Sequence, residues 1–418
     1  MSFWTRTGPE ARSGASALRI AMIGTRGVPA AYGGFETAVE EIGRRLVDRG
    51  HAVTVYCRSA GNSQPPPTRE YLGMRLVHLP ALHVKALETL SHTAFSVAHA
   101  TSGQRPDVAF VFNAANAPFV PFLRQRGIPT TVHVDGLEWK RDKWGGTARR
   151  YYRWAEQLSV KSADALIADA QGIADYYRQE FAIPTELISY GTRLLHQPPS
   201  DRLAELGLTP GGYHLVVARF EPENHVDVII DGYRRSSARM PLVVVGSAPY
   251  AGAHCRKITA LADDPRVRLL GGLWDQDQLD QLYAHSVSYL HGHSVGGTNP
   301  SLLRAMGART AAIAWDVVFN REVLGAYGAY FSDAATLSTL IEDAEFSPHH
   351  TEEVSEALQR RAAALYNWGH VTDGYEDLAQ RLAAGYSTQG ISVARTGRSP
   401  WNAPEPARRT STPVRGAL

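Results

Sequence analysis

Short apolar runs alternate with amphipathic stretches along most of the chain. In the first half, helical spacing is clearest at Glu36–Arg49 and Thr147–Ser162. Because strands that alternate with helices need crossover connections, the pattern predicts a parallel sheet covered on both faces. The runs that predict its buried strands are Leu18–Ile23, Ala52–Tyr56, Met74–Leu79, Val108–Phe112, Thr130–Val134, Ala165–Ala168 and Glu186–Ser189.

A second series of the same kind follows a segment rich in proline and glycine. Two such series predict an α/β protein with two Rossmann-like, doubly wound domains, at 18–192 and 213–385, joined by a linker at 193–212. The helical region from about 352 to 385 either closes the second domain or crosses back to the first, and we assign it to the second. The second series of strands is expected at Tyr213–Ala218, Leu242–Val245, Val267–Leu270, Val287–Leu290 and Ala311–Ala314.

Composition restricts the possible partners and compartment. The 418 residues carry a formal net charge of +2, which gives no electrostatic case for nucleic acid. No apolar run is long enough for a signal peptide or a membrane span, so we expect a cytoplasmic protein. Basic clusters such as Arg149 and Arg150 leave peripheral contact with the inner membrane face open. Residues 1–17 are rich in Ser, Gly, Ala and Arg, and residues 386–418 are rich in Ser, Pro, Gly and Arg. Both ends are predicted to be disordered tails.

Cysteine usage points to neither a disulfide framework nor a zinc site. The two cysteines, Cys57 and Cys255, are about two hundred residues apart, and neither belongs to a CxxC pair. We expect both to be buried or half-buried thiols.

A glycine pair, Gly33 and Gly34, follows the first predicted strand and precedes a helix. Glycines there let the backbone approach a ligand closely and direct N–H groups at an anion. The segment is neither GxGxxG nor a P-loop, so it supports neither a dehydrogenase nor a P-loop ATPase. A tight turn without a ligand remains the alternative.

The segment HGHSVGGTNPSLL at 291–303 carries a second anion-binding pattern. Asn299 suits the N-cap of a helix and Pro300 its first position. Gly296, Gly297 and Thr298 would then present N–H groups at a helix N-terminus, which favours a diphosphate. A capped helix without a ligand is the alternative.

The same segment also fits the G-x-S-x-G turn of an α/β-hydrolase, with Ser294 as nucleophile. Against this, the helix of such a turn begins at the serine, whereas Asn299 and Pro300 delay its start. No His-Gly-Gly-Gly segment precedes it, and the whole first domain would have no role. A hydrolase therefore stays a lesser alternative.

Two charged residues follow predicted strands, at the edge of a sheet where ligands of α/β proteins bind. Arg219 can hold a diphosphate by two hydrogen bonds, unless it is paired with Glu221 or Glu223. Asp135 can orient an acceptor hydroxyl or stabilise a cationic sugar, unless it only forms an Asp-Gly turn. Asp275 begins a metal-like Asp-x-Asp but is better explained as a helix cap.

Together these segments resemble the retaining glycosyltransferases of GT-B fold, family 4, and especially the bacterial rhamnosyltransferases of polysaccharide assembly. The matching pieces run in family order from about residue 18 to 325. They are GTRGVPAAYGGFET with RGHAVTVYCR, VDGLEWKRDKWGG, ARFEPEN, HGHSVGGTNPSLL and FNREVL.

The resemblance implies roles for individual residues. The donor diphosphate would lie between the Gly33–Gly34 loop, Arg219 and the amides of 296–299, with Glu322 where the nucleotide half-site ends. Asp135 would lie near the acceptor hydroxyl of a carbohydrate, a lipid-linked acceptor or a small molecule. Family members need no metal, so no cofactor is expected besides the nucleotide sugar itself.

Two positions depart from the family pattern. The glutamate that usually binds the donor ribose is Arg304 here, and the lysine that usually assists the phosphate arginine is Asn224. Either the nucleotide is bound by a variant arrangement, with Arg304 reaching a phosphate, or catalysis is weakened. A non-catalytic nucleotide-sugar-binding protein is therefore the second alternative.

Overall fold

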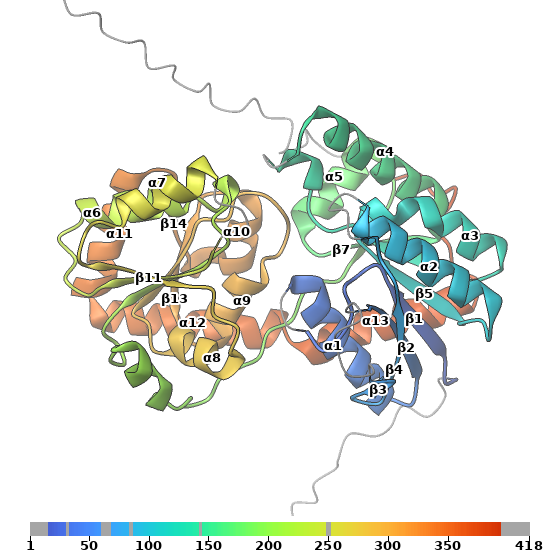
Figure 1. Ribbon diagram of the computed structural model, residues 1–418, viewed down its shortest axis with the longest axis horizontal. Helices are drawn as coiled ribbons and strands as arrows, with labels where there is room; N and C mark the ends of the chain where they lie inside the picture. Colours follow the sequence, from blue (N-terminus) through green and yellow to red (C-terminus); the bar gives the residue numbers. More distant parts are fainter. Residues whose placement is uncertain are drawn as a thin grey trace, which may run out of the picture.

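The computed structural model describes residues 16–30, 33–59, 68–82, 87–141, 144–247 and 252–393. Within these residues the chain forms two α/β lobes, each built on one sheet (Figure 1). The predicted pair of Rossmann-like domains is confirmed. No helix in these residues is both long and apolar enough to cross a bilayer.

The first sheet has the strand order β3-β4-β2-β1-β5-β6-β7-β8, and every pairing is parallel except that of β3 with β4. In its centre Ile20 of β1 lies between Val53 and Val108. Every residue of the central strand β5 is buried, as expected of a sheet covered on both faces. The strands are β1 (Arg19–Ile23), β2 (Ala52–Arg58), β3 (Glu70–Tyr71), β4 (Met74–Leu79), β5 (Val108–Phe112), β6 (Thr130–His133), β7 (Ala165–Ala168) and β8 (Glu186–Leu187).

The second sheet has the order β11-β10-β9-β12-β13-β14 and is entirely parallel. Successive strands are added on one side of β9 up to β11 and on its other side from β12 onward, so the strand order reverses between β9 and β12. In such sheets ligands bind outside the carboxyl ends of the strands at that point. The strands are β9 (His214–Val217), β10 (Leu242–Val245), β11 (Val267–Gly271), β12 (Ser288–His291), β13 (Ala311–Trp315) and β14 (Ala329–Phe331).

Helices cover both faces of each sheet. The first domain contains α1 (Gly34–Asp48), α2 (Glu88–Ser102), α3 (Val120–Gln125), α4 (Gly146–Ser162) and α5 (Gln171–Phe181). The later helices are α6 (Val226–Arg235), α7 (Ala253–Leu261), α8 (Gln276–Ala284), α9 (Pro300–Gly307), α10 (Val318–Leu324), α11 (Ala334–Phe346), α12 (Pro348–Leu365) and α13 (Trp368–Ala383). Short 3₁₀ helices occur at Ala114–Phe119, Glu138–Lys140, Asp201–Leu206, Pro222–Asn224 and Gly325–Tyr327.

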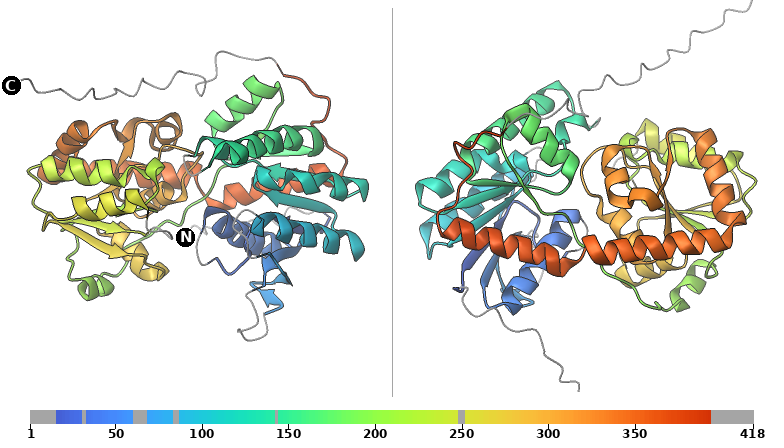
Figure 2. Two further views of the ribbon diagram at one scale, coloured as in Figure 1. Left: turned by 45° about the horizontal axis from the view of Figure 1, so that its top comes forward. Right: turned by 180° about the vertical axis from the view of Figure 1, so that it is seen from behind.

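The last two helices run along both lobes, one after the other (Figure 2, right). Helix α12 packs on α9 and β13 of the second domain, but α13 packs on α1 and β5 of the first. The buried ring of Tyr375 lies 5.1 Å from that of Phe110. The prediction that the whole region up to 385 belongs to the second domain was therefore wrong. Helix α12 belongs to the second domain, whereas α13 crosses back to the first, as the alternative had it. Burial of an apolar face of α13 against the first domain explains the crossing.

The chain crosses between the lobes twice at one place. Thr192, at the end of the first domain, forms a bridge with Asn367 between α12 and α13. The ring of Trp368 packs so closely on Gly191 that a Cβ there would lie 2.5 Å from it. The two connections therefore lie side by side, and we refer to this place as the hinge.

Part of the segment that was predicted to be a disordered C-terminal tail is ordered against the first domain. Residues 386–393 lie against the first domain. The hydroxyl of Tyr386 donates to Glu186, and the backbone N–H of Thr388 donates to the carbonyl of Asp164. Sequence composition missed this segment because it is held by hydrogen bonds rather than by apolar burial. Residues 1–15 and 394–418 lie outside the described residues.

Candidate functional site

The motif loops follow the carboxyl ends of strands and meet where the two domains touch. A Cβ placed on Gly136, next to Asp135, would lie 2.3 Å from the Cα of Gly296. A Cβ placed on Gly34 would lie 3.0 Å from the Cγ of Pro300. The fold thus brings together the three predicted segments at 33–34, 135–136 and 296–300.

The start of α9 has the predicted capping. Asn299 is its N-cap, and its side chain accepts a hydrogen bond from the backbone N–H of Ser301 at 2.9 Å. Pro300 occupies the first helical position. Gly296 has φ +135°, a backbone conformation that favours glycine. Among the described residues the N–H groups of Gly296 and Gly297 have no hydrogen-bond acceptor.

Arg219 lies two residues beyond the end of β9 and is half-buried. Its guanidinium makes no ion pair or hydrogen bond with any other described residue, Glu221 and Glu223 included. Its charge contributes, after burial, to a pKa of His293 that is well below the usual range. Arg219 is therefore a cation without a counter-ion beside the 292–299 loop.

Asn224 and His293 join the loops that follow β9 and β12. The Asn224 amide donates to the carbonyl of Arg219 at 2.7 Å, which leaves its oxygen facing the Nδ1 of His293 at 2.6 Å. Since burial lowers the pKa of His293, its ring is neutral and donates through this nitrogen. Asn224 is thus buried, with both of its polar groups used in holding Arg219 and His293 in place.

Asp135 is half-buried, two residues beyond the end of β6, with φ +57°. Its backbone N–H lies 3.4 Å from the Nδ1 of His133, a ring packed among Phe35, Phe112 and Tyr190. Burial lowers the pKa of His133 to about 3. Asp135 therefore lies at the domain contact, next to an uncharged cluster of aromatic rings that includes His133.

Three residues at the contact were not singled out from the sequence: Glu138, Arg141 and Glu223. Arg141 is buried between Glu138, an ion-pair partner, and Glu223 of the other domain, 3.8 Å away. Although burial opposes its charge, these carboxylates and Asp135 together raise the pKa of Arg141. Position relative to strand ends gave no signal for them because Glu138 and Glu223 lie in 3₁₀ helices and Arg141 directly follows one.

Thr298 and Glu322 each bond to the opposite domain. The N–H of Thr298 donates to the carboxylate of Asp169 at 3.0 Å, and its hydroxyl donates to the Asp169 carbonyl at 2.7 Å. Glu322 accepts from the N–H groups of Gln171 at 2.6 Å and Gly172 at 3.3 Å. Asp169 was missed, although it follows an apolar strand in the same way as Asp135.

Arg304 lies one turn into α9 and points at α8. Its guanidinium is paired with Asp280 and donates to the side chain and the carbonyl of Gln276 at 2.9 and 2.8 Å. The ring of Tyr283 lies below it, 5.5 Å away. These contacts favour a role in joining α8 to α9 over the hypothesis that Arg304 reaches a phosphate.

The geometry does not support a hydrolase. The hydroxyl of Ser294 donates to the carbonyl of Glu223 at 3.1 Å, and no described histidine bonds to it. The following helix begins at Pro300, six residues after the serine. Asp275, the other lesser signal, caps α8 by accepting from the N–H of Gln278.

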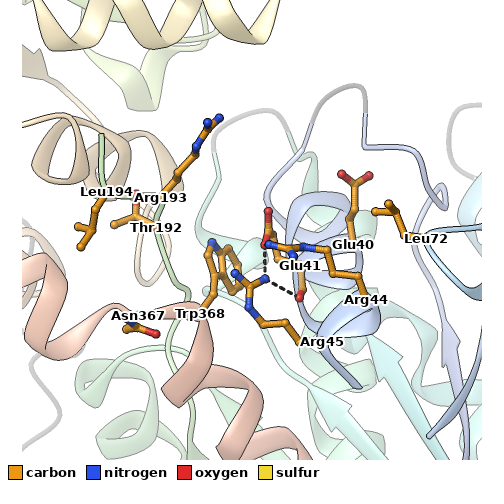
Figure 3. Close-up of a pocket in the computed structure, with 10 residues that line it drawn as sticks. All are labelled: Glu40, Glu41, Arg44, Arg45, Leu72, Thr192, Arg193, Leu194, Asn367 and Trp368. Carbon is orange, nitrogen blue, oxygen red and sulfur yellow. Dashed lines mark hydrogen bonds and ion pairs between the residues drawn. The ribbon is translucent and has the colours of Figure 1, made fainter. Parts of the chain in front are cut away.

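A cavity of about 640 Å³ opens at the hinge, between α1, the linker and the α12–α13 junction (Figure 3). Its wall carries Glu41, which pairs with both Arg44 and Arg45. With Glu40 and Arg193 included, the wall carries two carboxylates and three guanidinium groups, so it is slightly basic. None of the predicted site residues lines this cavity.

Comparison with known proteins agrees with the fold. Residues 33–191 match the model of the glycosyl transferase 4-like domain. Alpha-maltose-1-phosphate synthase of Mycolicibacterium smegmatis is 22% identical over 291 residues, 62% of this chain and 74% of the relative. The sucrose-phosphate synthase structure from Thermosynechococcus elongatus has a TM-score of 0.76 at 22% identity and covers 88% of this chain and 99% of its own.

A third similar structure is that of Anabaena HepE in complex with UDP-glucose. Its TM-score is 0.69 at 17% identity, over 87% of this chain and 99% of its own. The two-domain architecture is that of the GT-B fold, and residues 33–191 of the first domain are similar to the glycosyl transferase 4-like domain.

The close approach at Gly136 generates a test of the domain contact. Gly136→Ala should force the 296–298 loop away from the first domain, because the added methyl has no space. We expect the Thr298 amide, bonded to Asp169 in the wild type, to exchange its hydrogen about tenfold faster, while each domain keeps its fold. Hydrogen exchange read by mass spectrometry measures this.

Gly145→Ala is the matched control, because a Cβ there meets no atom within 4 Å. Unchanged exchange at Thr298 in Gly136→Ala would show that the two loops do not depend on this contact.

Proposed function

We propose that this GT-B glycosyltransferase transfers a hexosyl group, with retention of configuration, from a nucleoside-diphosphate sugar to a hydroxyl group. The acceptor is a carbohydrate, a lipid-linked sugar or a small molecule, and the sugar is rhamnose, as the motifs of the polysaccharide branch suggest. The observation that carries the proposal is Arg219: a half-buried cation without a counter-ion, beside a loop whose N–H groups at Gly296 and Gly297 lack acceptors.

These groups suit a leaving diphosphate. As the bond between the anomeric carbon and the phosphate oxygen breaks, negative charge develops on the diphosphate. Arg219 and the N–H groups of Gly296 and Gly297 would stabilise it, with the Gly33–Gly34 loop covering its other side. Because a fixed cation and a helix N-terminus supply this charge, we propose that no metal ion is needed.

The acceptor side of the reaction would belong to the first domain. Asp135 stands across the contact from the 296–299 loop and would orient the acceptor hydroxyl as it attacks the face that the diphosphate leaves. Asn224 would act indirectly, by holding Arg219 and His293. Glu322 and Arg304 would support the site through their contacts with α5 and α8 rather than touch the donor in this arrangement.

Arg219→Ala should weaken binding of UDP and dTDP by roughly 10- to 100-fold, because one charge-assisted contact with phosphate contributes about 1.5–3 kcal/mol. The fold should be retained, since the side chain makes no contact that holds the protein together. Titration calorimetry measures the affinity, and Arg235→Ala, on the exposed surface of α6, is the control. Wild-type affinity in a folded Arg219→Ala protein would refute the proposed donor site.

Asp135→Asn should reduce turnover by about a hundredfold while leaving UDP and dTDP affinity unchanged, because Asp135 is assigned to the acceptor. Asparagine tolerates the left-handed backbone of this position, so the turn should remain. Turnover is measured as sugar transfer or donor hydrolysis, with NMR of the product to test retention. If only the melting temperature falls, Asp135 is a turn residue. A wild-type protein that binds donors and never turns them over would favour the non-catalytic alternative.

We also propose that the first domain meets an anionic membrane surface through α4, which would bring a lipid-linked acceptor to Asp135. The helix exposes Arg149, Arg150 and Arg153 beside Trp154, whose side chain is 49% exposed. The only acidic residue of α4, Glu156, is buried. A basic helix with an exposed aromatic ring suits the interface of an anionic bilayer.

Arg150→Glu combined with Trp154→Ala should therefore lower co-sedimentation with phosphatidylglycerol vesicles about tenfold, since each cation near such a surface contributes about 1 kcal/mol. Arg235→Glu on the second domain is the control and should bind as the wild type does. Equal binding of the double variant and the wild type would rule out α4 as the membrane contact.

A further inference from the structure

Asp169 crosses from the first domain into the loop that precedes α9. It follows β7, and its side chain is only 1% exposed. One carboxylate oxygen, Oδ2, accepts from the N–H of Thr298 at 3.0 Å, and the Asp169 carbonyl accepts from the Thr298 hydroxyl. Thus a carboxylate of one domain accepts a hydrogen bond from an N–H group that lies beside a helix N-terminus of the other domain.

The second oxygen of Asp169 is buried without any hydrogen-bond partner among the described residues. It lies over Gly297, where a Cβ would come within 2.2 Å of it. Leaving a buried carboxylate oxygen unpaired is costly, and structures seldom keep such a group without a reason. The Oδ1 atom therefore marks a place where the arrangement is not at its electrostatic optimum.

Neighbouring charges increase that cost. Burial, followed by the charge of Asp135 and, more weakly, that of Glu322, raises the pKa of Asp169 well above its usual range. Glu322 accepts hydrogen bonds from the N–H groups of Gln171 and Gly172 at the N-terminus of α5. These are the second and third residues after Asp169 in the sequence. Each domain thus places one carboxylate on N–H groups of the other, and the two contacts lie next to each other.

We propose that Asp169 occupies the place of a donor phosphate on Thr298, so that a nucleoside diphosphate must displace it to bind. The chemistry is that of one anion replacing another. A diphosphate would take the N–H of Thr298 together with those of Gly296 and Gly297, and would gain the Arg219 cation that Asp169 does not reach.

Displacement of Asp169 couples donor binding to the domain contact. Because the Asp169 carbonyl and carboxylate both hold Thr298, their release loosens the first domain at this edge. The inference rests on the proposed donor site, since it takes the diphosphate to bind at Arg219 and the 296–298 loop.

The test measures UDP, inorganic pyrophosphate and uridine binding by calorimetry in the wild type, Asp169→Asn and Asp169→Ala. Both variants remove the competing charge, so both should bind UDP and pyrophosphate about tenfold more tightly, with uridine unchanged. Asp169→Asn keeps an oxygen for the Thr298 N–H, and its melting temperature reports whether the fold is retained.

Asp175→Asn is the matched control, because it removes a carboxylate from α5 at a residue that pairs with Arg178 and makes no hydrogen bond or ion pair with the described 296–298 loop. The inference is overturned if Asp169→Asn binds UDP as the wild type does. It is also overturned if Asp169→Ala binds UDP more weakly, because Asp169 would then be a protonated donor to the phosphate rather than its competitor.

Arg219→Ala, titrated alongside, separates this inference from the proposed function. Loss of UDP binding in Arg219→Ala with unchanged binding in Asp169→Asn would keep the donor site and reject the competition. Indifference of both variants would reject the donor site itself.

Discussion

The N–H groups that precede α9 need hydrogen-bond acceptors, and much of the arrangement at the domain contact depends on this requirement. The loop after β12 turns through Gly296 with a backbone that favours glycine, and its N–H groups gather at a helix N-terminus. The second domain supplies no acceptor for them among the described residues. Thr298 finds one in Asp169 of the first domain, while Gly296 and Gly297 find none. The domain contact and the proposed anion site are therefore the same place.

The surrounding charges are arranged for such an anion. Arg219 has no counter-ion among the described residues, and Asn224 holds both its backbone and the neutral ring of His293. Arg141, in contrast, is already balanced by buried carboxylates. Of the two buried or half-buried guanidinium groups here, only that of Arg219 is left for a ligand. The difference between Arg219 and Arg141 depends on which loops of the two domains face each other at the contact.

The sequence predicted the fold because apolar runs and helix caps are local signals. The strands β4, β5, β7 and β10 begin and end where the runs do, and Asn299 caps α9 as expected. Helix α13 was assigned to the wrong domain because an amphipathic helix does not specify the surface that it covers. For the site, the positions of Arg219 and Asp135 at strand ends follow from the parallel topology.

The contacts of individual side chains could not be predicted in the same way. Arg304 suggested a phosphate because it lies near a helix N-terminus, but Asp280 of α8 holds it. Asp169 and Glu322 act across the domain contact, on residues more than a hundred positions away. Such pairs are fixed by how two domains dock, which hydrophobic periodicity does not encode.

The most direct test of the central claim is a crystal structure of the protein grown with UDP or dTDP. We predict a diphosphate bonded to the guanidinium of Arg219 and to the N–H groups of Gly296 and Gly297, with Asp169 withdrawn from Thr298. The account would be contradicted by a diphosphate that binds elsewhere, for example in the cavity at the hinge, and makes no contact with Arg219.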